Sequence, residues 1–281
     1  LPAPDQPLFT DVSGSVSFSP SALKFSQVRG HIKPLTITAP EATMQMEENA
    51  FQLSVPSIQI AEGDWALSGN VEFSHQQESP PVLVVSASSR PVSLQHFSRI
   101  LPKPWLPPSV QNILMELDID GEMELLTGSV QWIGDEANTL IPEAVFRIAE
   151  GTIQIDPDHP PLSNVSGGIV LGADLFRFLD VEASIANSKI VVKEATLEQK
   201  DSEYWLDLKG KGRFSAHDVY QALLQDPRSQ ALLPQLDLYH RAQGNIQIAL
   251  GMQGPLNNPE KFQISEGHLL LDDIHLFSTK N

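Results

Sequence analysis

Apolar and polar residues alternate with a period of two along most of the chain, and Gly, Pro, Asn and Ser separate the alternating runs. Clear examples are residues 16–18, 67–73, 176–178, 205–208 and 246–248. Such alternation is typical of half-buried antiparallel strands joined by short turns. The 22 prolines agree with this interpretation, because proline disrupts helix interiors but is tolerated at strand ends and turns. The pattern predicts a mainly β fold.

Helical spacing of apolar residues appears in few places. The strongest cases are residues 93–101 and 216–224, and weaker ones lie at 109–116 and 228–233. We therefore predict a few short helices, which are too short to cover a whole sheet.

Residues 12–53 and 165–206 are two copies of one sequence. Val12-Ser13-Gly14 recurs as Val165-Ser166-Gly167 at a shift of 153, and 11 of 42 aligned positions are identical without a gap. Unrelated sequences of average composition would share about two or three. The copies share apolar alternation and turn residues rather than a polar constellation. A duplicated β pattern predicts a modular architecture that acts along a surface.

Two further correspondences extend the repeat. Residues 83–101 align with 206–224 at a shift of 123, so the first copy is expected to contain one extra strand pair within 54–82. Glu150-Gly151 aligns with Glu266-Gly267 at a shift of 116, which predicts that each unit ends in a strand, a Glu-Gly turn and another strand.

These alignments predict two repeats in one sheet. The first spans residues 1–157 and carries the extra hairpin and the helix near 93–101. The second spans 158–281 and carries the helix near 216–224 and the start of a further unit. The short, stiff linker between them predicts that the sheet continues across the boundary.

Charge and cysteine content exclude several classes of function. The net charge of −17 would repel phosphate backbones, so nucleic-acid binding through a basic surface is excluded. The absence of cysteine excludes disulfides and thiolate sites. The chain begins at Leu1 and has no apolar run near the roughly 20 residues that a spanning helix needs. We expect a segment of a longer, membrane-anchored protein, because residues 261–277 reopen the strand pattern.

No catalytic or metal-binding motif is present. The nearest histidine pair, His268 and His275, is better interpreted as part of a solvated edge strand than as a metal site. The Asp118-Ile119-Asp120-Gly121 segment resembles the start of a calcium loop, but it lacks the later Glu, and Gly121 is better explained as a strand-turn glycine. We expect no enzymatic activity, no metal and no cofactor.

One face of the predicted strands is apolar and is the candidate site. Its members are Val16, Phe18, Leu23, Phe25, Ile37, Leu53, Leu67, Val71, Phe73, Ile169, Leu171, Phe176, Phe178, Ile190, Val192, Leu206, Leu208, Ile246 and Ile248. Composition alone favours a closed β-sandwich or barrel core, and a closed sandwich would act as a scaffold or protein-binding module in envelope assembly. The alternative is a long, strongly curved sheet that leaves this face open as an apolar groove.

The repeat unit resembles the AsmA-like family of Gram-negative bacteria, above all the subgroup that includes the YhdP and TamB proteins. The resemblance rests on the order of the Val-Ser-Gly strand, the following hairpins, the helix at 217–224 and the closing segment. That segment, Gly-Pro-Leu-Asn-Asn-Pro-Glu-Lys-Phe at 254–262 followed by Glu266-Gly267, is similar to one seen often in this group.

The resemblance implies a fold, a location and a function. It implies a taco-like β-sheet with an apolar groove, in a protein that is anchored to the inner membrane and projects into the periplasm. The implied function is to carry phospholipid or other acyl chains between the inner and outer membranes, in outer membrane biogenesis. Envelope proteins are possible partners, and the family brings no catalytic residues.

Overall fold

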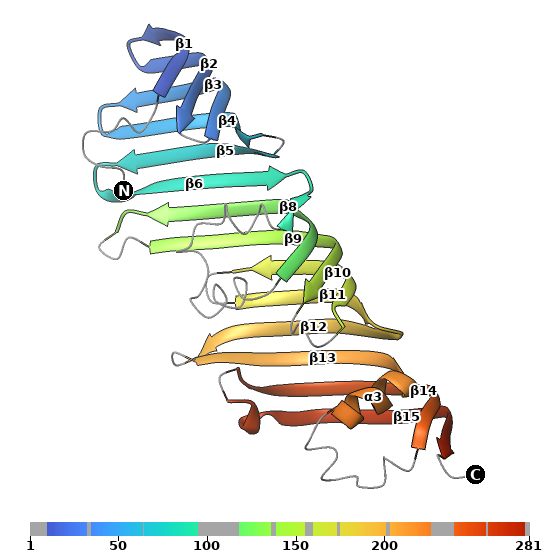
Figure 1. Cartoon of the computed structure of the whole chain (residues 1–281). Helices are drawn as coiled ribbons and strands as arrows, with labels where there is room; N and C mark the ends of the chain where they lie inside the picture. The colour runs from blue at the N-terminus through green and yellow to red at the C-terminus, as the bar shows by residue number, and fades with distance from the viewer. Residues whose placement is uncertain are drawn as a thin grey trace. The chain divides into compact units, whose positions relative to one another are not determined.

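A computed structural model describes residues 10–32, 35–63, 65–94, 118–135, 139–154, 160–172, 175–200, 203–225, 239–256 and 258–278. The strands form a single antiparallel sheet of 15 strands that does not close into a barrel (Figure 1). The predicted mainly β class is confirmed. A second sheet, which a sandwich would need, is absent from these ranges.

Each long strand pairs with the next one along the chain. The first strands are β1 (Thr10–Ser19), β2 (Ala22–Ile32), β3 (Leu35–Glu47), β4 (Ala50–Glu62), β5 (Trp65–Gln76) and β6 (Ser79–Ser89). They are followed by β8 (Asp118–Ile133), β9 (Thr139–Gln154), β10 (Leu162–Leu171), β11 (Leu175–Ile185), β12 (Ser188–Lys200), β13 (Glu203–Ser215), β14 (Tyr239–Pro255) and β15 (Gln263–Ser278). The two-residue strand β7 (Val92–Ser93) pairs with β8 outside this order.

The chain divides into two compact units, which interleave in sequence. The first comprises residues 1–92, 123–146 and 171–173, and the second comprises 93–122, 147–170 and 174–281. Compactness is a different property from sequence repetition, so the repeat boundary at 157/158 stays a prediction.

The duplication is visible in the backbone. Gln27 and Asp180, which are 153 residues apart, have φ angles of 53° and 47°, and neither is paired in the ladder of its strand. Asp11 and Asn164, at the same separation, both have a φ of 52°. An unpaired residue with positive φ is a β-bulge that bends its strand. Both copies therefore bend at equivalent positions.

The correspondence of Glu150-Gly151 with Glu266-Gly267 is wrong. Both pairs lie inside single long strands, β9 and β15, rather than in turns between strands. The residues with matching backbone are Glu150 and Asp273, with φ angles of 54° and 53° and a separation of 123. Gly121 and Gly244, with φ angles of 125° and 104°, have the same separation. Two strands with alternating apolar and polar residues can be aligned at many different shifts. Only the positions of the bends determine which shift relates the two copies.

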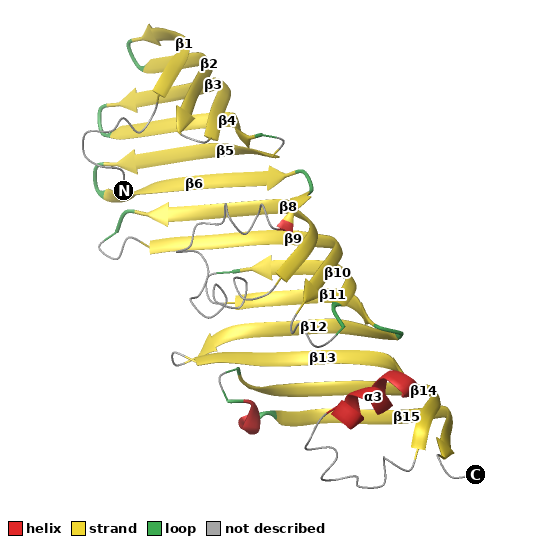
Figure 2. Cartoon of the chain, in the orientation of Figure 1, coloured by secondary structure: helices red, strands yellow, loops and turns green. Residues whose placement is uncertain are grey.

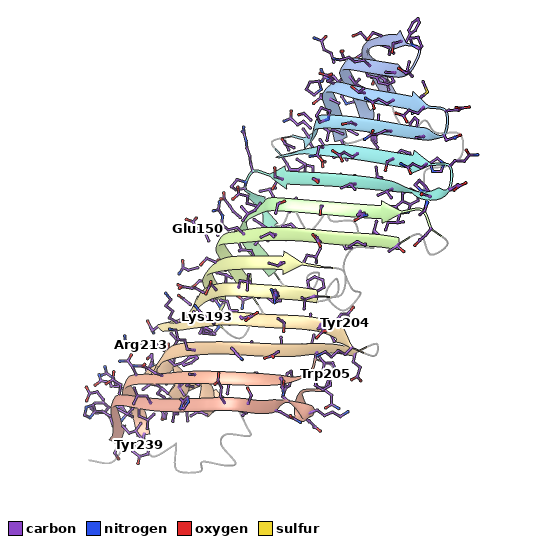
Figure 3. All side chains as sticks on the ribbon, turned by 180° about the vertical axis from the view of Figure 1, so that it is seen from behind. Glu150, Lys193, Tyr204, Trp205, Arg213 and Tyr239 are labelled. Atoms are coloured by element: carbon purple, nitrogen blue, oxygen red, sulfur yellow. The ribbon has the colours of Figure 1, made fainter. Side chains whose placement is uncertain are left out.

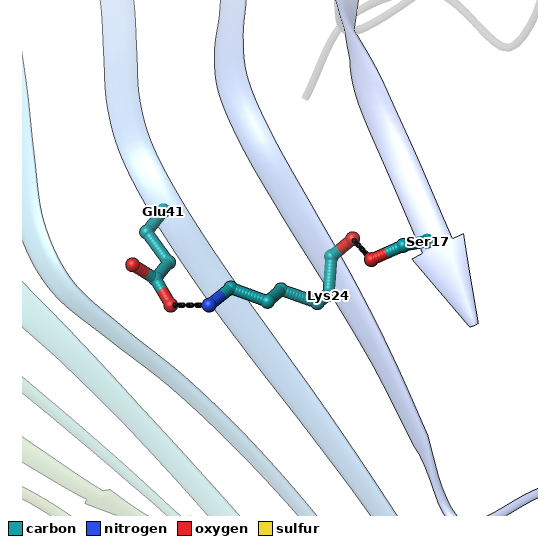
Figure 4. Close-up of polar contacts among 3 residues, drawn as sticks. All are labelled: Ser17, Lys24 and Glu41. Atoms are coloured by element: carbon teal, nitrogen blue, oxygen red, sulfur yellow. Dashed lines mark hydrogen bonds and ion pairs between the residues drawn. The ribbon is translucent and has the colours of Figure 1, made fainter. Parts of the chain in front are cut away.

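The copies also share a polar feature that the sequence comparison missed. Lys24 Nζ lies 2.7 Å from Glu41 Oε1 in the first copy (Figure 4). Arg177 Nε lies 3.8 Å from Glu194 Oε1 in the second, and both members are shifted by 153. All four side chains are about half exposed, so each pair contributes at most about 1 kcal/mol.

Helix α3 (Ala216–Gln225) occupies the range predicted at 216–224. The helix predicted near 93–101 lies largely outside the described residues. Asp218, in the first turn of α3, accepts hydrogen bonds from the backbone N–H and side-chain amide of Asn187 and from the Ser188 hydroxyl. The Ser188 hydroxyl in turn accepts one from the N–H of Ser215. Asp218 therefore ties the start of α3 to the turn between β11 and β12.

We expect Asp218→Ala to destabilise the second unit by about 1–3 kcal/mol, because it removes the acceptor for Ser188, which is only 2% exposed. Partial burial would raise the pKa of Asp218, but the hydrogen bonds from Asn187 and Ser188 outweigh it and hold the pKa below 3.8. The resulting stabilisation is fully present above pH 3.8 and is lost as the pH falls through the folded-state pKa.

Urea unfolding between about pH 6 and about pH 2 measures this contribution. In the matched variant Asp218→Asn, the free energy of unfolding should lose the part of its pH dependence that comes from Asp218. An unchanged acid dependence in Asp218→Asn would contradict the assignment.

Candidate functional site

The apolar residues of the first unit line up across successive strands. In the observed registers Phe18 lies opposite Leu23, Leu23 opposite Met44 and Met44 opposite Leu53. The row continues through Phe73 and Leu83. Directly opposed residues in neighbouring strands share one face of a sheet. The predicted residues Val16, Phe25, Ile37, Leu67 and Val71 lie on this same face.

The second unit repeats this arrangement. One row runs through Phe178, Ala195, Leu208, Met252 and Ile264. The predicted residues Phe176, Ile190, Val192, Leu206, Ile246 and Ile248 share its face. The paired positions of this face on β11–β15 include no charged residue. Ile169 and Leu171 lie two residues apart on β10.

The bends account for the face residues that the sequence pattern missed. Phe25 and Val28 are three residues apart, so strict alternation places them on opposite faces. The unpaired Gln27 restores Val28 to the face of Phe25. Asp180 does the same for Val181. The signal in the sequence that could have found them is a polar residue between two apolar residues that are three positions apart, as in Phe25 to Val28 and Phe178 to Val181.

This apolar face is accessible to solvent. Of the 19 predicted residues, 15 are half-buried, Leu171 and Phe176 are buried, and Val16 and Phe18 are exposed. Side chains of this size inside a closed core would be almost fully buried. The closed sandwich that composition favoured is therefore wrong, and the open alternative fits the structure.

Helix α3 covers one end of this face in the second unit (Figure 2). Ala216 and Tyr220 of the helix pack against the buried Ala242, and Leu224, Ile246 and Ile274 lie around them. The Tyr220 hydroxyl donates a 2.5 Å hydrogen bond to the carbonyl of Tyr239. The helix is ten residues long, so most of the face in this unit lies beyond it.

The opposite face of the second unit carries a shallow pocket of about 590 Å³. Lys189 lies directly opposite Arg213 there, and Val191 lies opposite Lys211 (Arg213 is labelled in Figure 3). Gln247, Ala249, His268 and Leu270 complete this side of the pocket, which contains no acidic residue. Glu182 pairs with Lys189 at 2.6 Å. The alternating Lys-Gly-Lys-Gly-Arg at 209–213 signals this basic surface in the sequence.

The remaining sequence candidates, His268, His275 and Asp120, lie on strands β15 and β8. His268 and His275 lie on the exposed strand β15, and His275 contacts Asp273 at 2.9 Å. The Asp120 carboxylate accepts a hydrogen bond from the N–H of Gly121, where β8 bends. No group of three or more His, Asp or Glu side chains that could hold a metal ion occurs among the described residues.

Among the described residues, no helix has the length and apolar character needed to cross a membrane.

Comparisons with known proteins do not assign the chain to a family. No family model, curated protein or solved structure matches the chain.

Proposed function

We propose that the apolar face binds the acyl chains of phospholipids, and that the chain is an AsmA-like periplasmic segment that carries lipid between the inner and outer membranes. The observation that carries this proposal is the apolar face itself. Its paired positions on β11–β15 carry no charge, it is aligned strand by strand, and most of its predicted residues are only half-buried. Large exposed apolar surfaces mark sites of interaction.

The chemistry of the face favours an acyl chain over a protein partner. The row that crosses β11–β15 consists of Phe178, Ala195, Leu208, Met252 and Ile264 and contains no Trp, Tyr or Arg. Protein interfaces concentrate their energy in Trp, Tyr and Arg and in oriented hydrogen bonds. The backbone groups of inner strands are already paired within the sheet, so the face offers non-directional contact. An acyl chain needs only such contact.

The available energy is sufficient for this role. Burying one methylene contributes about 0.8 kcal/mol, so a chain of about 15 methylenes that is half covered gains about 6 kcal/mol. This gain gives a moderate affinity, which suits a surface along which lipid must move as well as bind.

The experiment is to purify the chain without denaturant, extract it with organic solvent and identify bound lipid by mass spectrometry. We expect phospholipid to copurify and to compete with a fluorescent acyl probe. Short-chain phospholipids should compete less well than long-chain ones, because affinity follows the number of methylenes buried. An extract free of lipid, together with a probe that does not bind, would refute the proposal.

A further inference from the structure

Three basic side chains lie at adjoining positions on the second unit, on the face of the sheet opposite to the apolar face. Lys189 of β12 lies directly opposite Arg213 of β13, and Lys211 lies two residues before Arg213 on the same strand. Directly opposed residues have Cβ atoms about 5 Å apart, and residues two apart along a strand are separated by about 7 Å. The three side chains are exposed and line the shallow pocket of about 590 Å³. One small ligand can therefore contact all three.

Lys211 and Arg213 have no acidic neighbour across the strands. Lys211 lies between Val191 and Ala249, and Arg213 lies between Lys189 and a glutamine. Neither of them forms an ion pair with another residue of the described ranges. Like charges that lie directly opposite each other destabilise a sheet. The Lys189–Arg213 pair is therefore unfavourable for the fold.

The first copy of the repeat forms the same part of the sheet without these charges. At the shift of 153, Lys189 corresponds to Thr36, which lies opposite Ala61 rather than an arginine. The position that Lys211 takes in the second copy is held by Gln59 in the first. The fold therefore does not require the three cations. Residues that cost stability and are not needed by the fold are expected at a binding site.

The charge of the pocket matches a phosphate group. Glu182 pairs with Lys189 at 2.6 Å, so with His268 counted as neutral, three positive charges less one negative charge leave two. A phosphate monoester carries about −1.5 to −2 at pH 7 and offers three acceptor oxygens, which suit the paired donors of a guanidinium group. We propose that Lys189, Lys211 and Arg213 bind the phosphate group of a small, soluble phosphate ester.

The charge of the whole chain favours a small ligand. The net charge of −17 repels extended anionic surfaces and polymers. A small ester that comes within the Debye length, about 8 Å at physiological ionic strength, interacts mainly with the local cations. Val191 and Ala249 lie beside these cations and offer apolar contact to the organic part of the ester. The site lies on the face opposite to the proposed acyl-binding face and does not depend on that proposal.

Isothermal titration calorimetry with phenyl phosphate tests the site. We expect phenyl phosphate to bind, and Arg213→Gln and Lys211→Gln each to weaken binding at least about 10-fold, because each removes a charged hydrogen-bond donor. Glu182→Gln should tighten binding, because it frees Lys189 from its ion pair. The matched control is Lys200→Gln, which removes the same charge about 36 Å along β12 and should leave the affinity unchanged.

The source of the phosphate is tested with two further probes. Inorganic phosphate should bind more weakly than phenyl phosphate, because it makes no contact with Val191 and Ala249. Vesicles that contain phosphatidic acid should not bind at these cations. Vesicle binding that is tighter than phenyl phosphate binding and is lost in Arg213→Gln would overturn the assignment to a soluble ester.

Stability gives a readout that needs no ligand. In urea unfolding, Arg213→Gln should be as stable as the unsubstituted chain or more stable, because it removes the repulsion from Lys189. A lower unfolding midpoint would show that Arg213 serves the fold, and would overturn the proposal. A chain that does not bind phenyl phosphate, or that loses as much affinity in Lys200→Gln as in Arg213→Gln, would overturn it as well.

Discussion

Replacing Ile248 by Asp is expected to weaken acyl-chain binding by at least about 100-fold while leaving the chain folded. Ile248 is half-buried on β14, on the uncharged face and opposite Gly212 and Leu269. With no ligand bound, a carboxylate there remains in contact with water. An acyl chain lying over it would remove that water, at a cost of several kcal/mol.

Gln247→Asp is the matched control, because it introduces the same charge one residue away on the opposite face. Gln247 is exposed, so this variant should keep both its fold and its lipid affinity. Displacement of a fluorescent acyl probe measures binding, and circular dichroism with urea unfolding measures the fold. Equal affinities of the two variants for the probe would contradict binding on the apolar face. Unfolding of Ile248→Asp alone would show that this face is a closed core.

Replacing Gly244 by Ala is expected to destabilise the second unit by about 3 kcal/mol or more. Gly244 has a φ of 104°, which side chains rarely adopt, and a Cβ there would overlap the backbone carbonyl of Asp273. The bend at Gly244 also places Ala242 and Ile246 together beneath α3. Relieving the overlap would therefore disturb both the β14–β15 pairing and the packing of the helix.

Urea unfolding measures the loss, and hydrogen exchange locates it on β14 and β15. Gly267→Ala is the control on the neighbouring strand, because the nearest atom to its new Cβ lies 3.8 Å away. We expect that variant to change the free energy of unfolding by less than about 0.5 kcal/mol. A Gly244→Ala chain as stable as Gly267→Ala would show that the bend does not require glycine.

The sequence predicts strands well where alternation is uninterrupted, and it fails where a strand bends. Leu23 and Phe25 follow the period of two and were placed correctly, whereas Val28 was missed because the unpaired Gln27 reverses the alternation. An alternating pattern also matches another alternating pattern at every shift by an even number of residues. A two-residue match such as Glu-Gly therefore cannot determine how two strands align. The φ angles of Glu150 and Asp273 fix it, and these are not readable from the residues.

Whether the apolar face is open could not be decided from its residues. The same Leu, Ile and Phe side chains would suit a sandwich core or an open surface, because a strand has the same alternating sequence pattern in both. The difference depends on whether a second layer packs onto the sheet, which is a property of the whole topology. Helix α3, the one roofing element that the sequence placed correctly, is short and covers only the end near Ile246.

The pairing of each long strand with its successor has a consequence for how such a protein changes length. Three long strands, β4, β5 and β6, lie between β3 and the helical pattern at 93–101, whereas β13 alone lies between β12 and α3. In a closed barrel or sandwich, an added hairpin changes how the sheet closes, so strands far from the insertion must also shift. In a meander it disturbs only the strands beside it, because stability is close to a sum of nearest-neighbour terms. Insertion of single hairpins is therefore a route by which evolution can change the length of the apolar face in small steps.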